Sequence, residues 1–174
     1  MRIPAADLGL MTEHLQSHKG EINKLTRYRE LIANPALQAI LQSHLQMLQT
    51  HTAVMLELIN PSRYSHVALP VLSLNEQVTY GSLTPQEQEL LLELRSTAKM
   101  MGNVNFQSAQ MMKDSNVRHV HLQMAYQNSM LQDAYTRLLQ QTEGELIPLA
   151  DMTSQQAVYN KFHVNMRANK DSPY

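Results

Sequence analysis

Residues 60–84 read NPSRYSHVALPVLSLNEQVTYGSLT and lie between two stretches of helical periodicity. The segment contains Pro61, Pro70 and Gly81 among β-branched and aromatic residues, and its apolar residues follow no helical period. Helix–helix connections usually take about 2–8 residues, so a connection of this length is unusual unless the fold needs a long crossing. We therefore predict that residues 60–84 form a crossover that runs the length of a helical bundle.

Apolar residues at three- and four-residue spacing predict four helices on the two sides of this crossover, at residues 7–33, 35–59, 85–113 and 116–143. The chain folds back between the first two helices because Asn34 is a good N-cap and Pro35 suits the first helical position. Thr84, Pro85 and Glu87 form a capping-box pattern that starts the third helix.

The two halves of the sequence resemble each other. Aligning residues 34–36 with residues 115–117 also aligns Leu41-Gln42 with Leu122-Gln123. Two helical hairpins joined by one long crossover are typical of a ferritin-like four-helix bundle, in which the second and third helices run parallel. We therefore expect an all-α, ferritin-like four-helix bundle over residues 1–144 and a C-terminal tail over residues 145–174, with a short helix after Thr153.

Composition excludes several classes of partner. The chain has 174 residues, with 14 Lys and Arg against 15 Asp and Glu, so no basic excess is available to neutralise nucleic-acid phosphates. No apolar run approaches the roughly 20 residues that span a bilayer, and the N-terminus lacks the apolar core of a signal peptide. There is no cysteine. We therefore expect no nucleic-acid partner, no membrane insertion, no secretion and no thiol chemistry.

The acidic residues do not follow the pattern of a di-metal protein. Ferritin-like oxidases bind two metal ions through Glu-x-x-His motifs, and no Glu in this chain is followed by His at that spacing. Asp133 is the only acid in the fourth helix between Val117 and Gln141. Phosphate loops and hydrolase motifs are also missing from the sequence. We expect no enzyme activity, no catalytic residues and no cofactor.

Histidines lie on the apolar seams instead. If the first hairpin turns at Asn34, His18 and His51 lie level with each other, and His14 is one helical turn from His18. Three readings stay open. In the first, His14, His18 and His51 form a zinc or copper site. In the second, His18 and His51 form a buried polar layer and are hydrogen-bonded to each other, to Thr52 or to water. In the third, this polar layer lines a ligand cavity.

Three further expectations concern the second hairpin. Lys99 and Asp133 lie at the equivalent level and are expected to form an ion pair. His119 and His121 lie on different faces of the fourth helix and are expected at the surface. The methionine pairs are expected to fill gaps in the core or to form an adaptable interface; they are Met100-Met101 and Met111-Met112.

The fourth helix and the tail resemble the bacterial spore coat protein F family. The similarity lies in residues 124–139, MAYQNSMLQDAYTRLL, and in residues 145–156, ELIPLADMTSQQ. Pro148, Asp151 and Gln155-Gln156 match the family, whereas Ile147 and Ala150 stand where it often has tyrosine. The resemblance implies a ferritin-like bundle without a di-metal centre, made in the mother-cell cytoplasm of an endospore-forming bacterium and laid down in the spore coat.

The leading functional prediction is a non-enzymatic structural protein. A net charge of −1 weakens the self-repulsion that keeps proteins dispersed, and helices rich in Gln and Met can pack against copies of themselves. We expect a homo-oligomer, with other coat proteins as further partners. The alternative is a small metal-binding or redox protein of the ferritin-like superfamily that uses the histidine cluster.

Overall fold

The computed structural model describes residues 1–74, 81–143 and 147–168. This part of the chain is all-α, as predicted, and contains no strand. Its helices are α1 (Ala5–Arg29), α2 (Pro35–Ile59), α3 (Pro85–Met111), α4 (Ser115–Glu143) and α5 (Met152–Ala168). The middle of the predicted crossover, residues 75–80, and parts of the predicted tail, residues 145–146 and 169–174, lie outside the described residues.

Two helices end earlier than the sequence pattern predicts. The first prediction ran to residue 33, but α1 ends at Arg29 because the N–H groups of Glu30 and Leu31 bond three residues back and tighten the chain into the turn. The third prediction ran to residue 113, but α3 ends at Met111, since Met112 already has extended dihedral angles. The predicted second helix, residues 35–59, coincides with α2.

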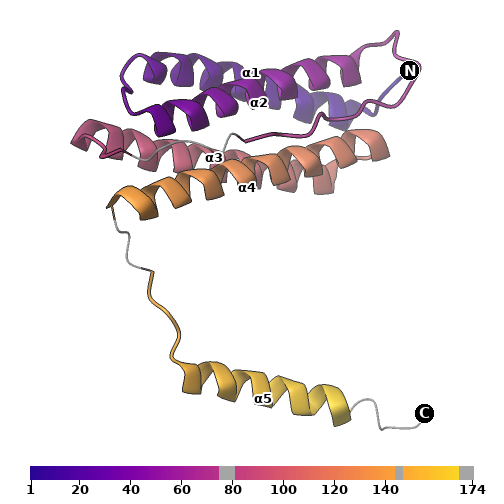
Figure 1. Cartoon of the computed structure of the whole chain (residues 1–174). Helices are drawn as coiled ribbons and strands as arrows, with labels where there is room; N and C mark the ends of the chain where they lie inside the picture. Colours follow the sequence, from indigo (N-terminus) through magenta and orange to yellow (C-terminus); the bar gives the residue numbers. More distant parts are fainter. Residues whose placement is uncertain (75–80, 144–146, 169–174) are drawn as a thin grey trace. The chain divides into compact units, whose positions relative to one another are not determined.

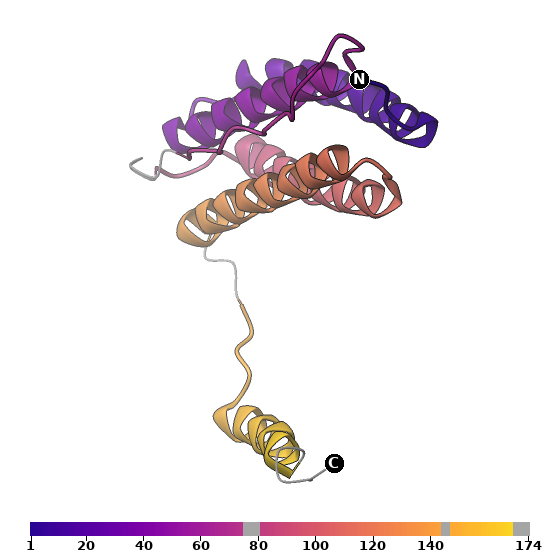
Figure 2. The ribbon, with the colours of Figure 1, turned by 90° about the vertical axis from the view of Figure 1, so that its right-hand side faces the viewer.

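The first four helices form two hairpins that lie against each other (Figure 1). Helix α1 pairs with α2 and α3 with α4, while α2 contacts α4 and α1 contacts α3. The described part of the crossover passes over α2 in the view of Figure 2, and its hydrogen bonds tie it to α4. The side chain of Asn116 on α4 bonds both the N–H and the carbonyl of Val67, at 2.9 and 2.8 Å, and Gln127 donates to the carbonyl of Pro70 at 2.7 Å.

Each hairpin supplies one buried carboxylate that caps the turn of the other hairpin. Asp7, in the first turn of α1, accepts hydrogen bonds from the N–H groups of Lys113 at 2.9 Å and Asp114 at 2.8 Å. Glu87, in the first turn of α3, accepts from Ala33 at 2.8 Å and Asn34 at 2.7 Å. These backbone groups lie at turns where no helical partner exists, so the carboxylates satisfy them and fix how the hairpins dock.

The interior of residues 1–144 has two apolar clusters. One contains leucines of all four helices together with Tyr135, and the other contains Met11, Met55, Met112, Val117 and Met124. On α1 to α4, buried polar side chains lie along the sequence between residues of the two clusters, for example His51 on α2 and Asn128 on α4; His121 lies next to them, among the α4 residues of the second cluster. We call this set the polar layer; it comprises His14, His18, His51, Asn105, Ser108, His121, Gln127 and Asn128.

Residues 145–174 form a second unit, which contains α5. From residue 147 to residue 162 every side chain is exposed, so this described stretch of the unit forms no core of its own. Among the residues that the structure describes, no helix has an apolar stretch long enough to cross a membrane.

Candidate functional site: a buried row of imidazoles

Four histidines of the polar layer form a row across three helices. The ring centroids of His121 and His14 are 5.1 Å apart, those of His14 and His18 are 6.2 Å apart, and those of His18 and His51 are 5.7 Å apart. None of the four side chains is more than 4% exposed. The predicted proximity of His18 and His51 is therefore confirmed, and the row extends further than the sequence indicated.

Hydrogen bonds fix the tautomers of His18 and His121. The Nδ1 of His18 lies 2.8 Å from the carbonyl of His14, and the Nδ1 of His121 lies 2.9 Å from the carbonyl of Val117. A carbonyl can only accept, so Nδ1 carries the hydrogen in both rings. The Nε2 of each neutral ring therefore presents a lone pair, and both Nε2 atoms are buried without a partner.

His51 also has one buried ring nitrogen with an unpartnered lone pair, because its other ring nitrogen bonds Gln127. The amide nitrogen of Gln127 donates to the carbonyl of Pro70 in the crossover at 2.7 Å, which fixes the orientation of the amide. Its oxygen then accepts from the Nε2 of His51 at 2.9 Å. The Nδ1 of His51 is left with a buried, unpartnered lone pair. His18 and His51 thus bond different groups, and the predicted bond between them is wrong; Thr52 bonds the carbonyl of Leu48 instead.

Two asparagines add further unpartnered acceptors. The amide nitrogens of Asn105 and Asn128 donate to the carbonyls of Met101 and Met124, both at 2.9 Å. Their Oδ1 atoms are buried and have no partner. The polar layer is therefore rich in acceptors that lack donors, a condition that costs about 1–3 kcal/mol for each buried group unless water or a ligand supplies the missing bond.

Burial keeps the imidazoles neutral. Desolvation lowers the pKa of His14, His18 and His121 to about 4, with neighbouring histidines adding to the effect. Desolvation also lowers the pKa of His51 to about 3, against the opposing hydrogen bond from Gln127. At neutral pH the row therefore carries no charge.

The row does not gather into a metal centre. His14 contacts the hydroxyl of Ser108 at 2.8 Å and the ring of His121, so it does not converge with His18 and His51 on one point. Within residues 1–74, 81–143 and 147–168, no three His, Asp or Glu side chains are grouped so that they could hold one metal ion.

Two expectations for the second hairpin are wrong. His121 is fully buried, because it lies beside Val117, Val120 and Met124 on the face of α4 that packs inward; His119 is exposed, as predicted. The prediction assigned only one inward-facing residue to each turn of this helix, so it did not include His121. A packed helix buries a wider apolar stripe, and His121 lies within that stripe. Asp133 bonds Arg137 one turn away at 2.9 Å rather than Lys99.

The predicted methionine pairs each divide between core and surface. Met101 and Met112 are buried, whereas Met100 is 51% and Met111 is 52% exposed. One residue of each pair therefore fills the core, and its neighbour on α3 is half exposed.

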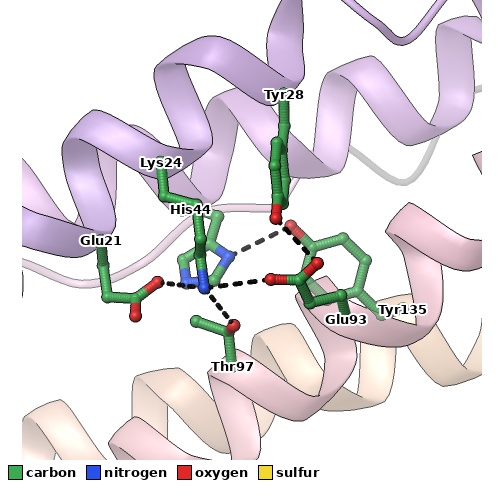
Figure 3. A network of polar contacts seen from close by, with 7 residues as sticks. All are labelled: Glu21, Lys24, Tyr28, His44, Glu93, Thr97 and Tyr135. Atoms are coloured by element: carbon green, nitrogen blue, oxygen red, sulfur yellow. Dashed lines mark hydrogen bonds and ion pairs between the residues drawn. The ribbon is translucent and has the colours of Figure 1, made fainter.

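A network of charged and polar groups joins α1 to α3 (Figure 3). Lys24 on α1 contacts Glu21 at 2.7 Å, Glu93 on α3 at 3.4 Å and the hydroxyl of Thr97 at 3.0 Å. Tyr28 donates to Glu93 at 2.7 Å, a bond that raises the pKa of Tyr28 to about 12. Two carboxylates thus share one lysine in this network.

His44 and Tyr135 lie at the same level in the interior (Figure 3). The Nδ1 of His44 is 3.1 Å from the Tyr135 hydroxyl, and both side chains are fully buried. Desolvation lowers the pKa of His44 to about 3 and raises that of Tyr135 well above 10, so both groups are neutral across the physiological range.

A pocket of about 380 Å³ opens between α1 and α3 and reaches the polar layer. Helix α1 supplies four of the lining residues and α3 supplies the other four. The lining residues are His14, Ser17, Gly20, Glu21, Met100, Met101, Val104 and Asn105.

No protein-family model, curated protein or solved structure matches this chain.

Proposed function

We propose that the chain is a non-enzymatic structural protein that self-associates through its helical faces, and that it is a component of the bacterial spore coat. In this proposal residues 1–144 form a ferritin-like four-helix bundle whose interior has lost its metal chemistry. The observation that carries the proposal is the apolar surface of α5, which is exposed over the described residues 152–162.

Helix α5 needs a surface to pack against. Tyr159 and Phe162 are 58% and 59% exposed, and Met152 is 85% exposed. The ring of Tyr159 stacks on His163 one turn later, with centroids 5.0 Å apart. An isolated helix of about 17 residues is marginal in water, so its stability depends on burying such a face.

A second copy of the chain suits this face. Between Met152 and His163 the helix carries one charged residue, Lys161, and its flanks are neutral glutamine, serine and asparagine. Two such helices can pair with little like-charge repulsion, and amide side chains can bond across the pair. A nucleic acid or an anionic membrane would instead require a basic stripe.

The interior favours a structural role over an enzymatic one. The buried carboxylates Asp7 and Glu87 bond backbone amides at the two turns, where they fix the docking of the hairpins. The layer between the apolar clusters is built of neutral imidazole and amide groups, whereas a hard di-metal centre needs several carboxylates.

Sedimentation velocity of the full chain over a wide concentration range tests self-association. We expect dimers or larger species whose fraction rises with concentration. Replacing Tyr159 and Phe162 with serine should weaken association by at least about tenfold, equivalent to about 1.4 kcal/mol. Tyr64→Ser is the matched control, because Tyr64 is 96% exposed but lies in the crossover. A monomer at all concentrations, or equal association of both variants, contradicts the proposal.

Localisation tests the coat assignment separately. A fluorescent fusion expressed during sporulation of an endospore-forming host should form a ring around the forespore. Diffuse mother-cell fluorescence that persists into the mature spore stage would contradict the assignment without bearing on self-association.

A further inference from the structure

We propose that α5 pairs in parallel and in register with α5 of a second copy of the chain, as a short two-stranded coiled coil in which the Gln155 side chains of the two copies meet. This inference rests on the proposed self-association, and it names the segment, the orientation and the register of the partner. It concerns the second unit alone, because every residue that carries it lies in or next to α5.

An alternating spacing of three and four residues runs along the exposed apolar face of α5. We call this row of residues the seam; it comprises Met152, Gln155, Tyr159 and Phe162, and all four are exposed. The sequence continues the spacing with Met166. These are the a and d positions of a heptad, the pattern that keeps one row of side chains on the partner when two helices coil around each other.

A hollow of about 340 Å³ on this face has the residue spacing of a coiled-coil hole. Its lining residues are Met152, Gln155, Gln156 and Tyr159, at positions i, i+3, i+4 and i+7. In a coiled coil each side chain of the seam inserts into a hole formed by four residues of the facing helix. In a parallel pair in register, a d side chain enters the hole made by two a residues, one d residue and one e residue. The hollow therefore receives Gln155 of the second copy.

The amide of Gln155 favours the parallel orientation. The amide nitrogen of Gln156 donates to Asn160 at 2.9 Å, whereas the amide of Gln155 has no partner among the described residues. In a parallel pair two Gln155 amides face each other, and each can donate to the oxygen of the other. In an antiparallel pair d residues face a residues, which are methionine and tyrosine here, so the amide would lose this matching partner.

Charge does not oppose a parallel pair, although parallel helices bring identical residues level with each other. Within residues 152–163, Lys161 alone is a lysine, arginine, aspartate or glutamate. It stands at the c position, away from the seam, and its ammonium lies 5.8 Å from the ring centroid of Phe162. Asp151 accepts from the N–H and the hydroxyl of Ser154, at 2.9 and 2.6 Å, so its carboxylate is held at the start of its own helix.

Single cysteines report the orientation, because the chain has no cysteine of its own. Met152→Cys places two thiols at the same end of a parallel pair, whereas an antiparallel pair separates them by more than about 20 Å. Lys161→Cys is the matched control, since residue 161 is also exposed on α5 but lies off the seam. In a glutathione redox buffer, at concentrations where the parent chain associates, Met152→Cys should form at least about tenfold more interchain disulfide than Lys161→Cys.

The outcomes separate this inference from the proposal on which it rests. A parent chain that stays monomeric in sedimentation velocity overturns both. Association with equal disulfide formation by Met152→Cys and Lys161→Cys shows that α5 packs on another surface or in another orientation. That result overturns the parallel pair and leaves self-association standing.

A second substitution in the Met152→Cys chain tests the register. Gln155→Leu makes the seam wholly apolar, so association should strengthen while shifted and antiparallel pairs become possible. At a matched fraction of dimer, the disulfide yield should fall by at least about threefold. Gln156→Leu is the control, because its amide already bonds Asn160, and it should leave the yield unchanged. An unchanged yield in the Gln155→Leu chain overturns the assignment of the register to Gln155.

Discussion

Gly102 of α3 lies so close to Asn128 of α4 that a Cβ added to the glycine would be 3.3 Å from the Cβ of Asn128 and 3.4 Å from the carbonyl oxygen of Ala125. These neighbours are the backbone and first side-chain atom of a long helix, so they cannot move independently. The close approach brings α3 and α4 together beside the polar layer.

We predict that Gly102→Ala destabilises the protein although alanine favours helices. The new methyl group must push α3 and α4 apart, and overpacking of this kind typically costs about 1–3 kcal/mol. Gly20→Ala should have the opposite sign and stabilise by about 0.5–1 kcal/mol, because no atom lies within 4 Å of the added Cβ. Urea unfolding followed by circular dichroism measures both. Equal stabilisation by both substitutions would contradict the close helix contact.

The stability of the fold should depend on the negative charge of Glu87. Burial tends to raise its pKa, but hydrogen bonds from Thr84, Asn34 and Ala33 outweigh this effect and lower the pKa below 4.5. The ionised form is therefore stabilised by folding, and this stability is present above about pH 4.5 and lost as the pH falls through the lowered pKa. At pH 7, Glu87→Gln should cost about 2–3 kcal/mol in the free energy of unfolding.

The control for Glu87 is Glu89, which is exposed on the same helix. Glu89→Gln should change the free energy of unfolding by less than about 0.5 kcal/mol. A loss of the same size in both variants would indicate a general charge effect and not a cap between hairpins.

Acid should unfold the protein at a pH well above the pKa values of its carboxylates. The folded pKa values of the buried histidines are about 3 to 4, against 6.5 for an exposed imidazole, so the unfolded chain binds more protons between these limits. Stability is therefore complete above about pH 6.5 and falls as the pH drops towards 4. A shift from 6.5 to about 4 corresponds to about 3 kcal/mol for one histidine.

The pKa shifts of several such histidines together correspond to a free energy as large as the roughly 5–15 kcal/mol stability of a typical domain. We predict cooperative loss of helical circular dichroism between about pH 4 and 6. His119→Gln should leave the midpoint unchanged, since His119 is exposed. Full helicity at pH 4 would show that the imidazoles are not held neutral by folding.

His18 and His51 should respond differently to replacement by leucine. One ring nitrogen of His18 has no hydrogen-bond partner, and the other bonds a carbonyl of its own helix. At pH 7 the free energy of unfolding of His18→Leu should therefore lie within about 1 kcal/mol of that of the parent protein. The variant should also unfold at a lower pH than the parent, because it lacks one buried imidazole. His51→Leu leaves the oxygen of Gln127 without its donor and should cost about 1–3 kcal/mol. Equal losses would contradict the assigned hydrogen bonds.

Local signals predicted the helix starts, and counting along a hairpin predicted the pairing of His18 with His51. Asn34 and Thr84 cap the helices that their sequence context indicates. Within one hairpin the turn fixes which residues lie level, so residue numbers suffice. Contacts between hairpins were missed, because the contact of His14 with Ser108 and the capping by Asp7 depend on how the two hairpins dock.

The pairing of Glu87 with Asn34 shows the same limit. The sequence identified Glu87 as a capping-box residue, and its carboxylate does bond Thr84. Its second role at the turn of the other hairpin follows only from the fold, since no local pattern specifies which backbone amides a carboxylate will reach.

The central claim is that the interior of residues 1–144 holds neutral imidazoles with bare ring nitrogens. Long-range ¹H–¹⁵N NMR of the histidine rings at pH 6 tests it most directly. We predict neutral rings, with the hydrogen on Nδ1 in His18 and His121 and on Nε2 in His51. Signals of charged imidazolium, or ¹⁵N shifts of metal-bound nitrogen in protein purified without a histidine tag, would contradict the claim.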